Sequence, residues 1–523
     1  MRKIFLFCFV VFGFGVQAQG IDVLHYGFAL SLDDKSDTII GIAFITFART
    51  PHTKTAFFDL TNTNSNGRGM RVTVVAKEED KKQIQLVFSH ENGKLKVQLP
   101  PNENTDTTTI SIGYIGQPAD GLIISKNKYG DRTFFADNWP NRAHEWIPCV
   151  DNTADKASFE FIIGAPSYYK VVSNGVETEE KINGDRKITS WFENTPLPTK
   201  VMVIGAAKFA TKVFEDSPKG IPVSAWVYPQ DSTKGFYDYA LATDILKFFS
   251  SYIAPYPYNK LANVQSKTIF GGMENASCIF YEENSVTGTR SCEDLLAHEI
   301  AHQWFGDMAT EKSFAHLWLS EGFATYFTDL YVEHKYGRES FLKRLKKERA
   351  EAVAFAQKST HPVVDTTSDL MSLLNANSYQ KGAWVLHMLR QEVGDSTFHK
   401  IMQTYYNRYK GSNADTRDFE AVAEKISGKS LKWFFDQWLY RPGLPQLKIT
   451  VINSSQGVRL TVEQLQKELY RFKLPVSVES TTTKEMVTTL FIKERTQSVL
   501  LSRGKLMKII VDPECTVLFN EIK

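Results

Sequence analysis

The chain has 523 residues, with 61 Lys and Arg against 59 Asp and Glu, 42% hydrophobic residues and five cysteines. This length and ordinary globular composition predict two or three domains with substantial cores, and they exclude a disordered chain, a collagen-like repeat and a small disulfide-stapled fold. The net charge of +2 argues against a dedicated nucleic-acid binder.

Residues 1–18 have the pattern of an export signal. Arg2 and Lys3 precede an apolar run from Ile4 to Val16, and a small-residue cleavage motif ends at Ala18. The run is too short to span a bilayer core of about 30 Å, and no later run is long enough, so we expect no transmembrane anchor. Without this segment the chain has 59 residues of each sign and no electrostatic attraction to DNA or anionic lipid. We therefore expect an exported protein, periplasmic or extracellular.

Residues 19–206 predict an antiparallel β domain. Short alternating runs rich in Val, Ile, Phe and Thr recur, for example Thr38 to Ala48 and Thr107 to Tyr114. Clusters of turn residues, such as those from Asn62 to Gly67, separate the runs.

Residues 207–442 change to a hydrophobic period of 3.6, which predicts a mainly helical domain. The helical runs are Phe236 to Tyr252, Ser291 to Trp304, Glu321 to Tyr336 and Tyr379 to Val393. A break from Arg441 to Pro445 ends this pattern, and residues 443–523 return to β alternation, which predicts a C-terminal β-sandwich. The predicted fold class is multidomain α+β.

Four cysteines follow the export signal: Cys149, Cys278, Cys292 and Cys515. None belongs to a C-x-x-C pair, so we expect no structural zinc or redox motif, and four thiols do not make a disulfide framework. A bridge between Cys278 and Cys292 is one alternative, and buried free cysteines, the commoner state, are the other.

The most specific motif in the chain is the helical run from His298 to His302, which reads H-E-I-A-H. Residues four apart lie on one face of a helix, so both imidazoles can reach one cation while Glu299 lies beside them to accept a proton from water. Catalytic zinc needs a third protein ligand and an open position for water. Glu321 follows His302 by nineteen residues, a spacing that lets a second helix present a carboxylate to the same ion. The alternative is two hydrogen-bonded core histidines and an ordinary helix-start acid.

A glycine-rich acidic segment precedes this motif by about two dozen residues. It consists of Gly271, Gly272, Met273, Glu274 and Asn275. Glycines allow another backbone to come close, and an acid beside them can neutralise a substrate ammonium. The preceding residues, Ile269 and Phe270, predict an edge strand. Taken alone, the segment is equally well read as a β-turn with a solvated acid.

The combination of these motifs resembles the gluzincin zinc aminopeptidases of the aminopeptidase N and leukotriene hydrolase family. In that family a G-x-M-E-N segment precedes H-E-x-x-H, and a glutamate follows after eighteen intervening residues, as it does here. The likeness includes Gln303–Gly306 and Ser378–Gly382 and covers most of the chain. It implies a thermolysin-like catalytic domain that binds one Zn²⁺ per chain.

For the metal, the resemblance implies that His298, His302 and Glu321 are the zinc ligands and that Glu299 is the general base. Zinc polarises the scissile carbonyl and lowers the pKa of its water toward about 7. We therefore expect a hydrolase in which a zinc-bound water, deprotonated by Glu299, attacks the first peptide bond of a peptide.

For the substrate, the resemblance implies that Glu274 anchors the free α-amino group, with Gly271, Gly272, Met273 and Asn275 in the same substrate-binding segment. It implies that Tyr379 stabilises the oxyanion, because a phenol can donate to the oxygen on which charge develops. Without the family, a lone tyrosine at a helix start is more often a packing residue. The expected partners are peptides with a free N-terminus, and the sequence makes no prediction of the oligomeric state.

The chain departs from the family where a glutamine or glutamate of the N-terminal domain helps to hold the substrate amine. Asp137, Asn138 and Trp139 stand there instead. Either Asn138 or Asp137 substitutes, or Trp139 lines the pocket by packing and Glu274 carries more of the recognition. Asp307 stands where the family often has asparagine. Relatives with a large helical C-terminal domain close it over the active site, so we expect a more open cleft here.

Three other functions remain as alternatives. A zinc endopeptidase would not need Glu274. A catalytically silent peptide-binding protein would not need Glu299 and Tyr379, which are both present. Epoxide hydrolysis, known in one branch of the family, has no supporting feature in this sequence.

Overall fold

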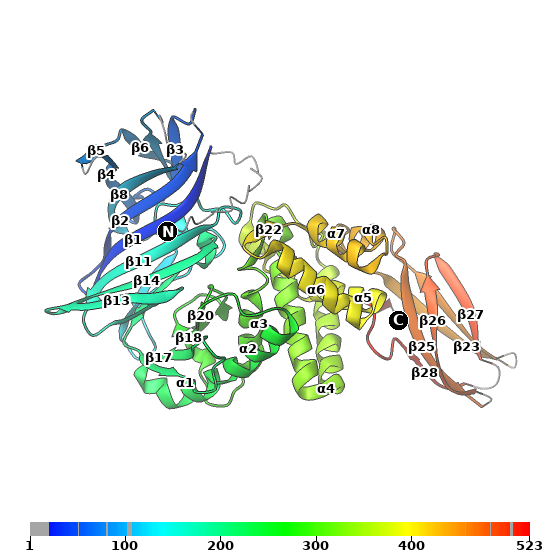
Figure 1. Cartoon of the computed structure of the whole chain (residues 1–523). Coiled ribbons are helices and arrows are strands. Elements are labelled where there is room, and N and C mark those ends of the chain that lie inside the picture. Colours follow the sequence, from blue (N-terminus) through cyan, green and yellow to red (C-terminus); the bar gives the residue numbers. More distant parts are fainter. Residues whose placement is uncertain are drawn as a thin grey trace, which may run out of the picture.

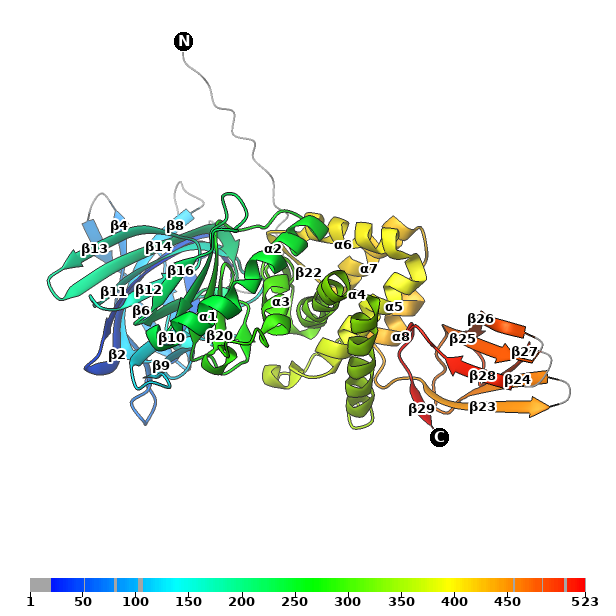
Figure 2. The ribbon, with the colours of Figure 1, turned by 90° about the horizontal axis from the view of Figure 1, so that it is seen from below.

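The computed structural model describes residues 20–50, 52–79, 82–101, 107–454, 457–481, 483–502 and 506–522. The predicted export signal, residues 1–18, lies outside the described residues. Three regions lie in a row: a β-rich N-terminal domain, a helical middle domain and C-terminal β-sheets (Figures 1 and 2). The predicted fold class is therefore confirmed, whereas the domain limits after residues 206 and 442 stay predictions.

The N-terminal domain is built on an eight-stranded sheet. Its strands are β1 (Ile21–Asp33), β2 (Ser36–Arg49), β4 (Gly69–Glu79), β5 (Lys82–Gln85), β8 (Thr107–Gln117), β11 (Ala157–Pro166), β13 (Val176–Asn183) and β14 (Arg186–Leu197). The order across the sheet is β13-β14-β11-β1-β2-β8-β4-β5, and only the β1–β11 pair is parallel among its described pairings. Period-two alternation buries Ala43, Ile45 and Phe47 of β2, whereas Phe44 is exposed and Thr46 is half-buried, so this sheet has one core face.

Two smaller sheets complete the N-terminal domain. One contains β9 (Leu122–Lys126), β10 (Arg132–Ala136), β12 (Lys170–Ser173) and β15 (Ile204–Ala207), in the order β12-β15-β10-β9. The other contains β3 (Thr55–Asp59), β6 (Phe88–Glu91) and β7 (Lys94–Gln98), with β7 in the middle. The segment after β10, residues 137–140, leads from this domain to the cavity described below.

The middle domain combines a five-stranded sheet with eight helices among its described residues. The strands are β16 (Ala210–Val213), β17 (Val223–Val227), β18 (Leu261–Ser266), β19 (Gly272–Met273) and β20 (Cys278–Glu282), in the order β16-β17-β18-β20-β19. The helices are α1 (Ser232–Tyr239), α2 (Leu241–Tyr252), α3 (Glu293–His302), α4 (Trp318–Ala356), α5 (Gly382–Val393), α6 (Asp395–Tyr409), α7 (Thr416–Ser427) and α8 (Lys432–Leu439). A short parallel pair, β21 (Ala309–Glu311) and β22 (Ser412–Ala414), lies beside them.

The structure corrects three local predictions in this domain. The single helix expected from Phe236 to Tyr252 is divided into α1 and α2. The edge strand expected at Ile269 and Phe270 is wrong: the edge strand is β19, two residues further on, because Gly272 and Met273 pair with β20. Helix α4 continues beyond the expected end at Tyr336, across a kink at Gly337 whose φ of 82° favours glycine.

The C-terminal region consists of two sheets. The first contains β23 (Gln446–Ser454), β24 (Gly457–Gln464), β27 (Thr496–Ser502) and β29 (Asn520–Ile522), in the order β27-β24-β23-β29. The second contains β25 (Phe472–Ser480), β26 (Thr483–Ile492) and β28 (Leu506–Val511), with β25 in the middle. Buried apolar residues of all three regions form one continuous cluster, so the middle domain packs against both neighbours.

Cys149, Cys278, Cys292 and Cys515 are all buried and free, so the structure holds no bridge between Cys278 and Cys292. Among the described residues, no helix combines the length and the apolar character needed to cross a bilayer.

Candidate active site

Helices α3 and α4 bring together the three residues predicted to bind metal. His298 and His302 lie one turn apart on α3, and Glu321 lies in the first turn of α4. The Nε2 atoms of the two histidines are 3.1 Å apart, and Glu321 Oε2 lies 3.2 Å from His298 Nε2 and 3.3 Å from His302 Nε2. The three donor atoms therefore form a nearly equilateral triangle.

This triangle fits a tetrahedral zinc ion. Ligands at the usual 2.0–2.1 Å from zinc, at tetrahedral angles, lie about 3.3 Å from one another. The observed separations of 3.1, 3.2 and 3.3 Å match that value. Two imidazoles and one carboxylate are also a donor set that catalytic zinc uses, with one position left for water or substrate.

The ring of His302 is held by its second nitrogen. Its Nδ1 donates to the carbonyl oxygen of Phe305 at 3.1 Å, and Ser320 Oγ lies 3.0 Å from the same nitrogen. Because a carbonyl can only accept, Nδ1 carries a proton, and a cation bound by this ring would take the place of the Nε2 proton that the ring otherwise shares with Glu321.

Both ligand helices border a cavity of about 240 Å³. Its lining residues are Trp139, Phe270, Gly271, Gly272, Met273, Glu274, Leu295, His298, Glu299, His302, Glu321, Leu374 and Tyr379. All of the predicted site residues except Asn275 thus line one cavity. Asn275 is fully buried and lies outside this lining.

Glu299 faces the glycine-rich segment. A Cβ atom added to Gly272 would lie 2.3 Å from Glu299 Oε1, so any larger residue at this position would have to displace the carboxylate. Burial raises the pKa of Glu299 well above its ordinary value, His302 opposes the shift, and the nearby carboxylates of Glu274 and Glu321 add to it.

The pKa of Glu321 is shifted in the opposite direction to that of Glu299. Burial would raise the pKa of its carboxyl group, but the charge of His302 and the hydrogen bonds from both histidines lower it below the ordinary value. Glu321 is therefore a carboxylate, the form in which it can bind a cation.

One oxygen of the Glu274 carboxylate has no hydrogen-bond partner among the described residues. The side chain is 3% exposed, and its Oε1 atom accepts no hydrogen bond from any described residue. A buried carboxylate oxygen without a donor is costly, which suits a position that a cationic substrate group completes.

Gln303 fixes the glycine-rich segment around Glu274 to α3. In the sequence, this residue stood out only as part of the resemblance to the family. Its Nε2 donates to the carbonyl oxygen of Glu274 at 2.7 Å, and its Oε1 accepts from the backbone N–H of Ser277 at 2.7 Å. Asp307 Oδ2 accepts a further hydrogen bond from Gln303 Nε2 at 2.9 Å. Asp307 thus supports Gln303, and through it the position of Glu274. Gln303 directly follows His302, and this position next to the motif was the signal available in the sequence.

Tyr379 lies in a π-helical segment, Asn377–Lys381, that precedes α5. This segment approaches α4 closely because Gly322 and Gly382 meet: a Cβ added to Gly322 would lie 2.9 Å from the Gly382 backbone. The Tyr379 ring stacks on that of His298, with centroids 5.9 Å apart. Burial and the neighbouring carboxylates raise the pKa of Tyr379 well above its ordinary value, so the phenol keeps the proton that it needs to donate.

The N-terminal domain contributes Trp139 to the cavity, whereas Asp137 and Asn138 are turned to other partners. Asp137 accepts from Arg142, from Thr268 Oγ1 and from the backbone of Ile269, at 2.8 to 3.0 Å. Of the alternatives at this departure from the family, the structure favours the one in which Trp139 lines the pocket.

The side chain of Asn138 is also fully used. Its Nδ2 donates to the carbonyl oxygens of Met202 at 2.6 Å and Thr199 at 3.1 Å, and its Oδ1 accepts from Trp146 Nε1 at 2.8 Å. Neither polar residue of this segment is therefore placed to hold a substrate amine.

A buried ion pair, which sequence reasoning missed, joins the N-terminal domain to the middle domain. Lys200 Nζ lies 2.6 Å from Glu311 Oε1, and both side chains are at most 1% exposed. Burial alone would lower the pKa of Lys200, but Glu311 and Glu274 raise it above the ordinary value, so the ammonium stays charged. The lone lysine between Pro198 and the apolar run that follows it was the available signal.

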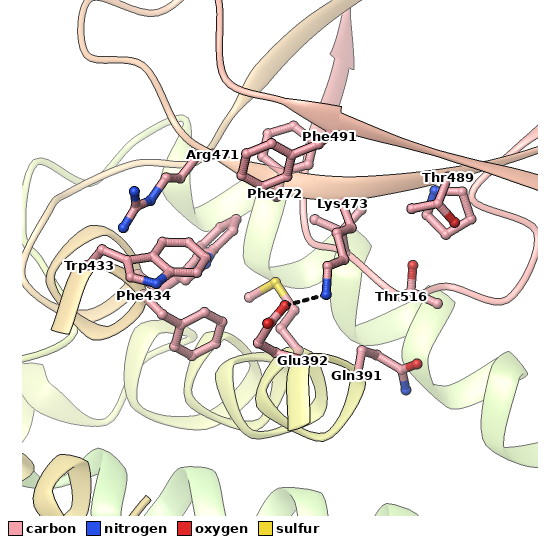
Figure 3. A pocket seen from close by; sticks show the side chains of 14 residues that line it. Gln391, Glu392, Trp433, Phe434, Arg471, Phe472, Lys473, Thr489, Phe491 and Thr516 are labelled. Atoms are coloured by element: carbon pink, nitrogen blue, oxygen red, sulfur yellow. Dashed lines mark hydrogen bonds and ion pairs between the residues drawn. The ribbon is translucent and has the colours of Figure 1, made fainter. Parts of the chain in front are cut away.

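A second cavity, of about 210 Å³, lies where α5 and α8 meet β25 and β26 (Figure 3). Aromatic side chains such as Trp433 and Phe472 line it, Arg471 lies over the Trp433 ring, and Lys473 pairs with Glu392 at its rim. It shares no described lining residue with the metal cavity.

The fold and the metal cavity together define the class of proteins in which H-E-x-x-H and a distant glutamate hold one metal ion between two helices. Comparison with known families specifies this class. Residues 237–438 match the peptidase family M1 domain, and residues 23–200 match the peptidase M1 N-terminal domain. The chain belongs to peptidase family M1, whose peptidases are zinc metalloproteases. The predicted family is therefore confirmed.

Individual relatives agree with this assignment. The chain is 28% identical to "Probable aminopeptidase 2" of Sulfurisphaera tokodaii over 71% of its own length and 49% of the relative's. It is 30% identical to "Glutamyl aminopeptidase" of Rattus norvegicus over 62% of its length and 35% of the relative's. It is 29% identical to "Tricorn protease-interacting factor F2" of Thermoplasma acidophilum over 69% and 47%. The aligned part thus spans about half the length of these relatives or less.

Proposed function

We propose that this chain is an exported zinc aminopeptidase that removes the N-terminal residue of peptides. One observation carries the proposal: the three possible metal ligands and Glu274, one carboxylate oxygen of which has no hydrogen-bond donor among the described residues, line the same cavity. A metal site alone would serve any peptidase. The buried acid beside it adds a place for a free α-amine next to the scissile bond, which only the first residue of a peptide offers.

His298, His302 and Glu321 would hold one Zn²⁺ per chain. When bound, the ion polarises the scissile carbonyl and makes water a nucleophile near neutral pH. The charge of a bound cation would oppose the rise in the pKa of Glu299 that burial and neighbouring acids cause.

The remaining steps belong to the side chains. Glu299 accepts a proton from the attacking water and passes it to the amine that leaves. Tyr379 donates its phenol hydrogen to the carbonyl oxygen as negative charge develops there. Glu274 pairs with the α-ammonium and so fixes which peptide bond lies at the cation.

The first test measures the zinc content of the protein and its activity on aminoacyl substrates. We expect about one zinc per chain and hydrolysis of aminoacyl fluorogenic substrates that a chelator abolishes and added zinc restores. Freshly purified protein without zinc, with activity indifferent to chelator, would refute the proposal.

The second test separates an exopeptidase from an endopeptidase. N-acetylating one peptide removes the charge that Glu274 pairs with, which should cost about 2–4 kcal/mol of transition-state stabilisation, or roughly 30- to 1,000-fold in kcat/KM. Glu274→Ala should erase most of this preference. Glu282→Ala, on the neighbouring strand but outside the cavity lining, is the matched control and should keep it. Comparable cleavage of both peptides by the wild type, or internal cuts in the acetylated one, would favour the endopeptidase.

Export is tested by the N-terminus of the mature protein. We expect cleavage after Ala18 in the native host, measured by mass spectrometry of the purified chain. A mature chain that retains Arg2 and Lys3 would contradict it.

A further inference from the structure

Part of the metal cavity has an uncharged wall. Besides the metal cluster, Glu274, Glu299 and Tyr379, the lining consists of glycines and apolar side chains, and no Lys or Arg is among the described lining residues. Trp139 is the largest of the apolar groups. Its indole meets the Phe270 ring edge to face, with centroids 5.7 Å apart.

Trp139 is supported from behind. The ring of Phe314, which does not line the cavity, packs edge to face on the indole at 5.7 Å. The carbonyl oxygen of Trp139 accepts from Arg142 Nε at 2.8 Å, and the side chains of Asp137 and Asn138 fix the backbone on the preceding side. Because its neighbours are fully hydrogen-bonded, Trp139 is held in place before any substrate binds.

The cations nearest to this wall are already neutralised. Arg142 lies over the Phe270 ring at 5.8 Å and pairs with Asp137 at 2.8 Å and Asp120 at 3.0 Å. Lys200 lies over the Phe314 ring at 5.8 Å and pairs with Glu311. Each of these two cations thus packs on an aromatic ring and already has a carboxylate partner.

From this arrangement we propose that Trp139 is a specificity-determining residue: with Phe270 it receives the side chain of the substrate's first residue and selects apolar, uncharged ones. The proposal rests on the proposed aminopeptidase function. An acidic side chain would be desolvated against the aromatic wall without a cation, and a basic one would find only carboxylates that the amine and the chemistry already use. A leucine, methionine or phenylalanine side chain would instead bury apolar surface on the indole.

The test is a panel of aminoacyl coumarin amides carrying Leu, Met, Phe, Ala, Glu or Arg. For the wild type we expect kcat/KM for Leu, Met and Phe to exceed that for Glu and Arg by roughly 100-fold or more, with Ala in between. Trp139→Ala should lower kcat/KM for Leu by about 10-fold or more, mainly through KM, and change the Ala substrate by less than about 3-fold.

Trp139→Phe keeps an aromatic ring and should retain most of the preference. Trp438→Phe, at an equally buried tryptophan of α8 outside the metal cavity, is the matched control and should leave all ratios unchanged.

The outcomes distinguish the two proposals. Wild-type enzyme that cleaves Glu or Arg substrates as well as Leu overturns the specificity and leaves the aminopeptidase intact. No cleavage of any panel member by zinc-loaded protein overturns both. Because the wild-type panel needs no variant, misfolding of Trp139→Ala would not remove the test, and Trp139→Phe still measures the contribution of the indole. An unchanged Leu-to-Ala ratio in a folded Trp139→Ala would move the specificity to another residue.

Discussion

The middle domain is joined to a β region on each side, and the two junctions differ in what they touch. At the N-terminal junction, Trp139 lines the metal cavity and Lys200 pairs with Glu311 of β21. At the C-terminal junction, Arg349 of the distal part of α4 pairs with Asp512. The cavity of Figure 3 also lies there, and it shares no described lining residue with the metal cavity.

This difference assigns unequal roles to two regions that are both made of β-sheets. The N-terminal domain supplies part of the substrate wall, so its attachment to the middle domain should affect catalysis. The C-terminal region packs against α4, α5 and α8 at positions outside the lining of the metal cavity. Its attachment should therefore affect the free energy of unfolding and not catalysis. Variants at the metal cluster should cause the largest loss of kcat/KM, and the effects of variants at the two junctions can be compared with that loss.

The largest effect is expected for His302→Ala. This change removes one of the three donors and the ring held by Phe305, so zinc is lost together with the charge stabilisation that it supplies. We expect kcat/KM to fall by about 1,000-fold or more and the zinc content to fall below roughly half an equivalent. Elemental analysis and the coumarin assay measure both. A variant with full zinc and full activity would contradict the assignment of this ligand.

Glu299→Gln should separate metal binding from turnover. The amide keeps the size of the side chain beside Gly272 but cannot accept the proton of water. We expect zinc content near that of the wild type and a fall in kcat of about 100- to 10,000-fold, with KM little changed. If zinc and activity fall together, Glu299 is a structural residue.

The N-terminal junction is tested by Lys200→Met. The change leaves Glu311 buried without its partner, which should cost about 3–5 kcal/mol in the free energy of unfolding measured by urea denaturation. Because Lys200 also acts on Glu274 and packs on Phe314 behind Trp139, kcat/KM of the folded enzyme should fall by roughly 3- to 10-fold.

The double variant Lys200→Met with Glu311→Leu removes both charges and is the control. Most of the lost stability should return, because an apolar pair of similar volume replaces an ion pair whose desolvation is costly. No recovery would mean that packing, rather than the unpaired carboxylate, causes the loss.

Sequence alone predicted the parts of this molecule that depend on local spacing. His298 and His302 face one way because residues four apart share a helix face, and the nineteen-residue spacing brings Glu321 to them. The β-helical-β order followed from the change in hydrophobic period, and the structure confirms that class.

Sequence could not predict contacts that tertiary pairing decides. Which of Asp137, Asn138 and Trp139 faces the cavity depends on hydrogen bonds to residues more than sixty positions away. Lys200 and Glu311 lie 111 residues apart, and neither belongs to a motif. The two-residue strand β19 exists only because β20 pairs with it, so the apolar residues before it were the misleading signal.

Arg349→Met is the counterpart of Lys200→Met at the C-terminal junction. Arg349 pairs with Asp512 and lies 4.9 Å above the Trp384 ring and 5.0 Å above that of Phe519. The Asp512 side chain left behind is fully buried, but it keeps hydrogen bonds from a neighbouring backbone N–H and hydroxyl at 2.7 Å each, so we expect a loss of about 2–3 kcal/mol in the free energy of unfolding. In the folded enzyme kcat/KM should stay within about 2-fold of the wild type. A loss of activity comparable to that of Lys200→Met would remove the distinction between the junctions.

The smallest effect is expected for Lys473→Met, also at the C-terminal junction. The Lys473 side chain is 52% exposed, and its partner Glu392 keeps a second cation, Lys429, at 2.9 Å. The carboxylate is therefore not left unpaired, and an exposed ion pair contributes at most about 1 kcal/mol. We expect a change in the free energy of unfolding below that value, reduced further at high salt because exposed charges are screened, and unchanged kcat/KM. A loss as large as that of Arg349→Met, in urea denaturation at low and high salt, would show that the rim of the second cavity helps to hold the C-terminal β-sheets in place.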